Sequence, residues 1–188
     1  MKASRLAALA AASMLGGCAL SGCTDAPSAP GQLPGPVPAG VTFHEAPDSA
    51  PSAPVFSLEL LDGQVLDLAE QWDQRPIVLV FFESWCTRCQ DQQAGINEVV
   101  EEYEDVVLFV GIASQSEPAA VEQYVSDTDL TYPVGIDPSG RTALRYAVAE
   151  PPLVALISKD GRLLRGWPEG VSGAELREQI DQQAVRAH

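Results

Sequence analysis

Residues 77–103 read IVLVFFESWCTRCQDQQAGINEVVEEY, and this stretch decides the fold. The run from Ile77 to Phe82 is apolar throughout and mixes β-branched with aromatic side chains, which predicts a short strand buried on both faces. A Cys-x-x-Cys motif, Cys86 to Cys89, follows directly. Apolar residues then recur with helical spacing at Ile96, Val99, Val100 and Tyr103. The stretch therefore predicts strand, dithiol and helix in immediate succession.

This order of elements gives the two cysteines different chemistry. Cys86 is expected at the mouth of the helix, where free backbone N–H groups and the positive end of the helix dipole favour a thiolate. Cys89 is expected one turn further in, close enough to close a disulfide. We therefore expect Cys86 to attack and Cys89 to resolve the mixed disulfide. A structural disulfide and half of a metal site are the alternative interpretations.

The motif Trp85-Cys86-Thr87-Arg88-Cys89 after a buried strand resembles the active site of the thioredoxin superfamily. In particular it resembles the TlpA/ResA-like membrane-anchored thiol–disulfide oxidoreductases, over roughly residue 54 to the C-terminal helix. The resemblance implies an α/β, thioredoxin-like three-layer fold with a mixed central sheet flanked by helices, an N-terminal β-hairpin and a βα insertion. It also implies a docking groove shaped by Trp85 and no cofactor.

The chain begins like an exported bacterial lipoprotein. Lys2 and Arg5 precede an almost entirely small and apolar run, and residues 1–22 are interpreted as a signal peptide. Leu20-Ser21-Gly22-Cys23 resembles a lipobox, which makes Cys23 the expected lipidation site. Cys18 is the alternative site, and ordinary cleavage with release of a soluble protein is the other possible outcome.

The segment after the signal peptide reads as a tether. Residues 23–53 are rich in Pro, Ala, Gly and Ser and have no apolar periodicity, which predicts a disordered linker. The thioredoxin-like domain is expected to occupy residues 54–188. This organisation predicts an extracytoplasmic domain anchored to a bacterial membrane through lipid.

The numbers of cysteines and of charged residues exclude further classes of function. Once Cys18 is removed and Cys23 is lipidated, only the Cys86–Cys89 pair is left, and His44 and His188 are the only histidines. A Cys–His hydrolase, a His-ligated metal site and a haem site are poorly supported. Loss of the signal peptide takes the net charge from −15 to −17, which argues against nucleic-acid partners. We expect a monomer.

The rest of the chain alternates predicted strands and helices, as the three-layer fold requires. The expected elements are a hairpin over 55–68 with its turn at Asp62-Gly63, a helical turn over 69–74, a strand over 106–112, a helix from about 117 to 126, a strand over 131–136, a helix over 142–146, a hairpin turning at Lys159-Asp160-Gly161, and a last helix capped by Ser172.

Pro152 precedes the first strand of the last hairpin. The resemblance gives it the role of the family's cis-proline, whose neighbouring backbone pairs with an extended substrate segment. A proline at a sheet edge or in a turn is the alternative interpretation.

Three residues depart from the family pattern. Val80 stands where thioredoxin has a buried acid, and Arg88 stands between the cysteines where some relatives have an acid. Arg88 would stabilise the thiolate and push the pair toward oxidising chemistry. Glu83 is proposed to accept the proton of Cys89, and the alternative is a solvated carboxylate that balances Arg88.

The leading function is an anchored thiol–disulfide oxidoreductase whose direction of electron flow stays open. Its expected partners are thiols and disulfides of exported proteins, with apocytochrome c one possibility, and a membrane-bound electron donor or acceptor. A peroxide-reducing redoxin is one alternative, although such enzymes usually have Thr at the position of Glu83. A thioredoxin-fold binding module or copper metallochaperone is the other, although copper-delivery relatives use a longer Cys spacing and a His.

Overall fold

The computed structural model of the protein describes residues 31–186. Cys18, Cys23 and His188, on which three of the sequence predictions depend, lie outside this range. The elements are β1 (Thr42–Phe43), β2 (Ser57–Leu60), β3 (Val65–Asp67), a 3-10 helix η1 (Leu68–Gln71), β4 (Ile77–Phe81), α1 (Thr87–Glu102), β5 (Leu108–Ala113), α2 (Pro118–Asp127), β6 (Val134–Ile136), α3 (Arg141–Arg145), β7 (Leu153–Ile157), β8 (Leu163–Trp167), α4 (Gly173–Gln183) and β9 (Val185–Arg186).

Seven strands form a mixed sheet in the order β3-β2-β6-β5-β4-β7-β8. Strand β5 runs parallel to both β4 and β6, whereas β7 runs antiparallel to β4 and to β8. Strands β2 and β3 form the predicted hairpin, and β2 also pairs with β6. β4 therefore lies inside the sheet, which agrees with its uninterrupted apolar sequence.

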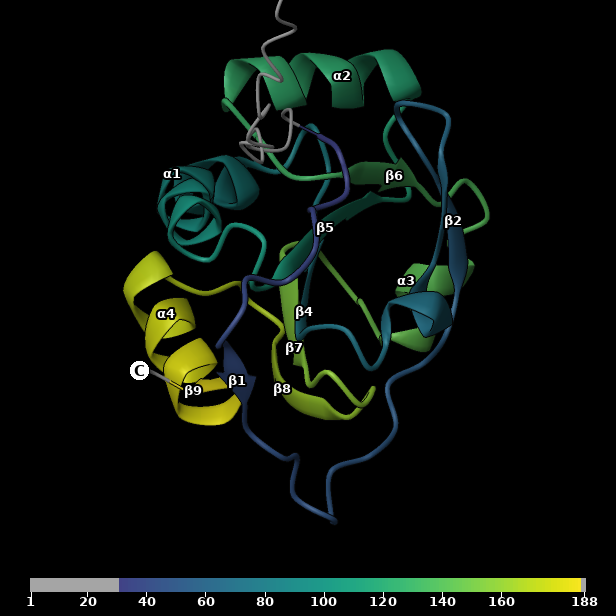
Figure 1. Cartoon of the computed structure of the whole chain (residues 1–188). Helices are drawn as coiled ribbons and strands as arrows, with labels where there is room; N and C mark the ends of the chain where they lie inside the picture. The colour runs from purple at the N-terminus through teal and green to yellow at the C-terminus, as the bar shows by residue number, and fades with distance from the viewer. Residues whose placement is uncertain (1–30, 187–188) are drawn as a thin grey trace, which may run out of the picture.

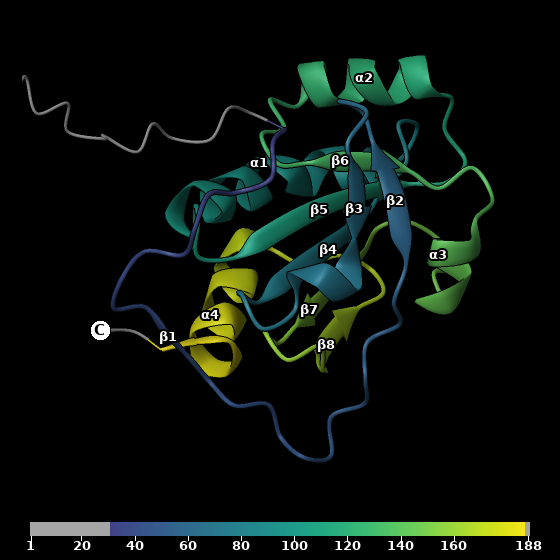
Figure 2. The same ribbon diagram turned by 45° about the vertical axis from the view of Figure 1, so that its right-hand side comes forward.

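Side chains of β4 alternate between two cores, one on each face of the sheet. Val78 and Val80 pack with residues of α1, α2 and α4, whereas Ile77 and Leu79 pack with residues of η1, α3 and the β2–β3 hairpin. Figures 1 and 2 show α1 and α4 on one side of the sheet and α3 on the other. The predicted thioredoxin-like three-layer fold is confirmed, and Val80, which stands where thioredoxin has a buried acid, is fully buried.

Helices α1 and α4 approach closely because glycine occupies the crossing point on each. A Cβ atom at Gly173 would lie 2.3 Å from the carbonyl oxygen of Gly95, nearer than real contacts allow. Helix α1 is assigned without interruption from Thr87 to Glu102. Gly95 is thus explained by packing against α4. Gly173 opens α4 directly after Ser172, whose hydroxyl accepts the Glu175 backbone N–H as predicted.

The N-terminal segment, residues 31–53, corrects the sequence prediction of a disordered tether. Strand β1 pairs with β9 at the C-terminal end of the domain. Gly35 donates its N–H to Asp105 at 2.8 Å, and Ala53 donates to the carbonyl of Gly161 at 2.8 Å. A proline-rich segment without apolar periodicity can dock in this way because backbone hydrogen bonds need no side-chain pattern.

No helix within residues 31–186 combines the length and the apolar character needed to cross a bilayer.

Candidate active site

Cys86 and Cys89 lie at the start of α1, at the end of the loop that follows β4. Cys86 is the N-cap residue of the helix, and its Sγ accepts the backbone N–H of Cys89 at 3.1 Å. The two sulfurs form a disulfide, with Cα atoms 5.2 Å apart. The predicted placement of both cysteines at a helix N-terminus is therefore confirmed.

The surface gives access to one sulfur of the pair. Cys86 is 5% exposed and lines a cavity of about 740 Å³ together with Trp85, Gln115 and Pro151, whereas Cys89 is completely buried. An incoming sulfur must reach the disulfide from this cavity, and the first sulfur that it meets is therefore the Sγ of Cys86. The geometry agrees with Cys86 as the attacking residue and Cys89 as the resolving residue.

Trp85 and Arg88 stand at the entrance to this cavity. Trp85 is 60% exposed, and its part in substrate docking stays a prediction. Arg88 is exposed and lines both this cavity and an adjoining one of about 660 Å³, as does Glu150. Within residues 31–186 Arg88 makes no ion pair, so its charge is available at the mouth of the site.

Pro152 follows a cis peptide bond, Pro151–Pro152, as the resemblance implied. It directly precedes β7, whose first residue, Leu153, pairs with Phe81 near the end of β4. Pro152 itself is buried, whereas Pro151 lines the cavity of Cys86. The part that Pro152 plays in substrate docking stays a prediction.

The structure corrects one of the two interpretations of Glu83, the solvated carboxylate that balances Arg88. Glu83 is 3% exposed, and no Arg88–Glu83 ion pair occurs in the described residues. Its Oε1 accepts the N–H and hydroxyl of Ser114 and the N–H of Gln115, and its Oε2 accepts the hydroxyl of Ser116 at 2.6 Å. Glu83 therefore holds the loop 114–116, which includes the cavity residue Gln115. Its role as proton acceptor of Cys89 stays untested.

This loop was not predicted from the sequence, although a signal for it existed. β4 and β5 are parallel, with Phe81 opposite Ile112, so the residues that follow the two strands meet at one edge of the sheet. Glu83 and Ser114 occupy these positions. Gln92 was missed as well: its Oε1 accepts the N–H of Val171 at 3.1 Å, and its buried Nε2 has no hydrogen-bond partner among residues 31–186.

A thioredoxin fold with a disulfide-bonded Cys-x-x-Cys pair at the first turn of a helix defines a thiol–disulfide redox protein. The chain belongs to the AhpC/TSA family, whose model matches residues 50–166. It is 27% identical to the thiol–disulfide oxidoreductase ResA of Bacillus thuringiensis subsp. konkukian over 142 residues, which cover 75% of this chain and 79% of that protein.

Solved structures agree with these relatives. A secreted Mycobacterium tuberculosis disulfide oxidoreductase homologous to E. coli DsbE is 26% identical, with a TM-score of 0.62, covering 68% of this chain and 95% of its own. The exposed lipoprotein thioredoxin of Streptococcus pneumoniae is 26% identical, with a TM-score of 0.61, covering 69% of this chain and 99% of its own. The chain is thus a thiol–disulfide oxidoreductase of the ResA/DsbE type.

Proposed function

We propose that this protein exchanges thiols and disulfides with exported proteins outside the cytoplasm, while a lipid on Cys23 holds it at the membrane. The observation that carries the redox part is the asymmetric pair: Cys86 caps α1 and lines a cavity, whereas Cys89 is buried behind it. Arg88, exposed at the entrance, adds positive charge where a thiolate must form.

In the reductive direction the thiolate of Cys86 attacks a substrate disulfide. A Cys86–substrate bond forms, and one substrate sulfur leaves as a thiolate that takes up a proton. Cys89 then loses its proton and attacks Cys86, which releases the second substrate sulfur. The substrate has gained two electrons and the pair has become a disulfide. In the oxidative direction each step runs backwards, and a membrane-bound partner restores the starting form.

The groove around Cys86 suits a polypeptide substrate. Exposed Trp85 and Pro151 both line it, and Pro152 connects Pro151 to Leu153, the first residue of β7. We assign Pro152 to this docking groove, where neighbouring backbone can pair with an extended segment. Exported proteins supply such segments while their disulfides form, and apocytochrome c is one candidate among them.

Anchoring through Cys23 is supported by the lipobox-like sequence and by the description of one structural relative as an exposed lipoprotein. Because the N-terminal segment docks on the domain, only residues 23–30 separate the lipid from Gly31. At ~3.5 Å per residue these span less than about 30 Å. The anchor therefore holds the domain nearer to the bilayer than a tether of residues 23–53 would.

The test combines insulin reduction with trapping of the intermediate, in Cys86→Ser and Cys89→Ser variants. We expect Cys86→Ser to be inactive and unable to form a mixed disulfide. Cys89→Ser should accumulate the mixed disulfide, because its resolving sulfur is missing. Equal trapping by both variants would contradict the assigned roles, and peroxide consumption at enzyme-like rates would favour the redoxin alternative. The reduction potential of the pair then decides the direction of electron flow.

A further inference from the structure

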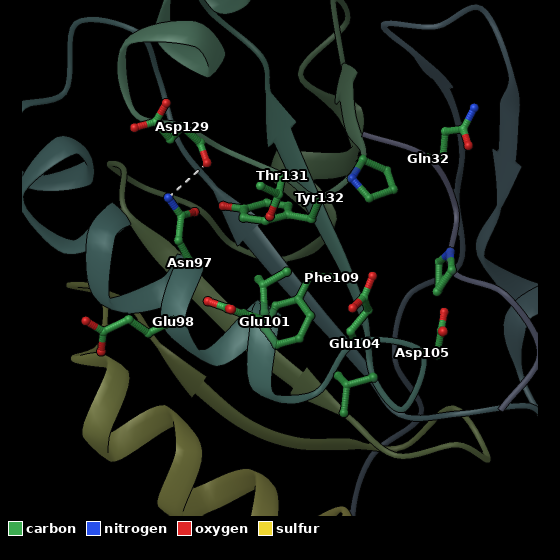
Figure 3. A pocket seen from close by; sticks show the side chains of 14 residues that line it. Gln32, Asn97, Glu98, Glu101, Glu104, Asp105, Phe109, Asp129, Thr131 and Tyr132 are labelled. Carbon is green, nitrogen blue, oxygen red and sulfur yellow. Dashed lines mark hydrogen bonds between the residues drawn. The ribbon is translucent and has the colours of Figure 1, made fainter. Parts of the chain in front are cut away.

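A separate cavity lies beside the C-terminal half of α1, away from the cysteines (Figure 3). Its volume of about 400 Å³ is within the range of ligand pockets, roughly 300–1,000 Å³. Cys86 caps the first turn of the same helix, and the cavity begins at Asn97, roughly 15 Å further along the axis. The redox site and this cavity are therefore distinct.

The floor of the cavity is apolar. Phe109 of β5 and Tyr132 before β6 provide its aromatic surface, and both are nearly buried. The remaining apolar lining residues are Pro34, Val100, Val107 and Pro133. Pro34 comes from the N-terminal segment, so docking of that segment completes one wall. Such a floor takes an aliphatic side chain well, because each buried methylene contributes about 0.8 kcal/mol.

The rim of the cavity is acidic. Its carboxylates are those of Glu98, Glu101, Glu104, Asp105 and Asp129. The ion pairs found within residues 31–186 involve Glu102 and Glu175, so no rim carboxylate belongs to one. Asp105 accepts the N–H of Gly35. In Figure 3 the carboxylates of Glu101 and Glu104 lie near Phe109, at the edge of the apolar floor.

The position of these acids opposes the stability of their own helix. Helix α1 has no basic residue in its last turn, and Glu101 lies there, while Glu104 follows the helix end. Negative charges near the C-terminus of a helix are unfavourable, since the dipole places partial negative charge there. A sequence chosen for stability alone would carry Lys or Arg at these positions, and local conflicts of this kind are typical of functional surfaces.

The chemistry of the cavity selects one kind of occupant. A second copy of the protein is itself strongly acidic, with a formal net charge of −15 for the full sequence. The preceding residues of this chain, 24–30, contain Asp25 and no Lys or Arg. An amphipathic basic segment can pack apolar side chains on the floor of the cavity and place positive charges beside the carboxylates of its rim. We propose that this cavity docks a short basic segment of a partner protein, with an aliphatic side chain over Phe109 and a Lys or Arg beside Glu101 and Glu104.

Titration with a defined peptide tests the proposal. The probe is an acetylated and amidated Lys-Leu-Lys tripeptide, and binding is followed by amide NMR shifts in the full domain. In Glu101→Gln/Glu104→Gln the dissociation constant should rise about five- to tenfold, because two favourable charge interactions are removed. This variant should fold, because it removes two negative charges that interact unfavourably with the dipole of α1.

A matched variant separates a specific site from general attraction between opposite charges. Glu70→Gln/Glu122→Gln removes the same charge from exposed positions that do not line the cavity. A ratio of dissociation constants of threefold or more between the two variants, with shifts at Val100 and Val107, supports the proposal. A smaller ratio, or no binding at about 1 mM peptide, overturns it. Insulin reduction should be the same in both variants, so this result is independent of the redox function.

Discussion

Replacing Glu83 by Gln tests whether the buried carboxylate organises the loop beside Cys86. The two side chains have nearly the same volume, so no cavity forms and the effect comes from hydrogen bonding. The carboxylate accepts four hydrogen bonds, three at Oε1 and one at Oε2. An amide oxygen can keep the three donors of Oε1, although hydrogen bonds to a neutral acceptor are weaker.

The amide cannot replace the fourth hydrogen bond, which the Ser116 hydroxyl donates to Oε2. This hydroxyl also accepts both the N–H of Ser84 at 2.8 Å and the hydroxyl of Ser84 at 3.0 Å, so both of its lone pairs are already used. An amide NH2 in the place of Oε2 would set a donor against this donor. Losing about 1–2 kcal/mol here and about 1 kcal/mol at the weakened contacts lowers the free energy of unfolding by roughly 2–3 kcal/mol.

Urea and thermal unfolding of oxidised protein measure this loss. At about 2–4 °C per kcal/mol for a domain of this size, the melting temperature should fall by about 4–12 °C. Glu117→Gln is the control, because Glu117 is exposed and makes no cap hydrogen bond. A loss below about 1 kcal/mol in Glu83→Gln would refute the assigned role. The rate at which Cys89 resolves a mixed disulfide is a second readout, and an unchanged rate removes Glu83 from the proton transfer.

Two further changes test the packing and the anchor. Gly173→Ala should destabilise the protein by about 1–3 kcal/mol, because the new methyl group meets the carbonyl of Gly95, whereas Gly166→Ala, with open space around it, should change the free energy of unfolding by less than half a kilocalorie. Incorporation of labelled palmitate should be lost in Cys23→Ser and kept in Cys18→Ser; the reverse pattern would move the lipidation site to Cys18.

Local signals made most of the fold predictable. The apolar run of β4 is buried along its whole length, the Cys-x-x-Cys motif begins α1, and the Asp62-Gly63 turn joins β2 and β3. Each of these features depends on residues close together in the chain, where hydrophobic period and turn chemistry are informative. The cis peptide before Pro152 was expected from the resemblance alone, since no local pattern distinguishes cis from trans proline.

Docking of the N-terminal segment could not be read from the sequence in the same way. Its contacts reach far along the chain: Gly35 bonds to Asp105, and Thr42 pairs with Arg186. The composition of this segment shows that it lacks a periodic apolar face. It does not show whether the backbone N–H and C=O groups form hydrogen bonds with the folded domain. The cavity beside α1 was hidden for the same reason, because Pro34 completes one of its walls.

Glu83 shows which long-range contacts can still be anticipated. It was interpreted against residues near it in the chain, Arg88 and Cys89, yet its partners follow β5. A polar residue directly after a buried parallel strand faces the residues directly after the neighbouring strand, because both strand ends meet at one edge. With β4 and β5 both predicted as buried strands, Ser114 and Ser116 were the nearest donors to consider. Partners of a residue at the end of a parallel strand should therefore be sought on the neighbouring strand of the sheet. Glu83 and Ser114 are 31 residues apart in the chain, and they still form a hydrogen bond.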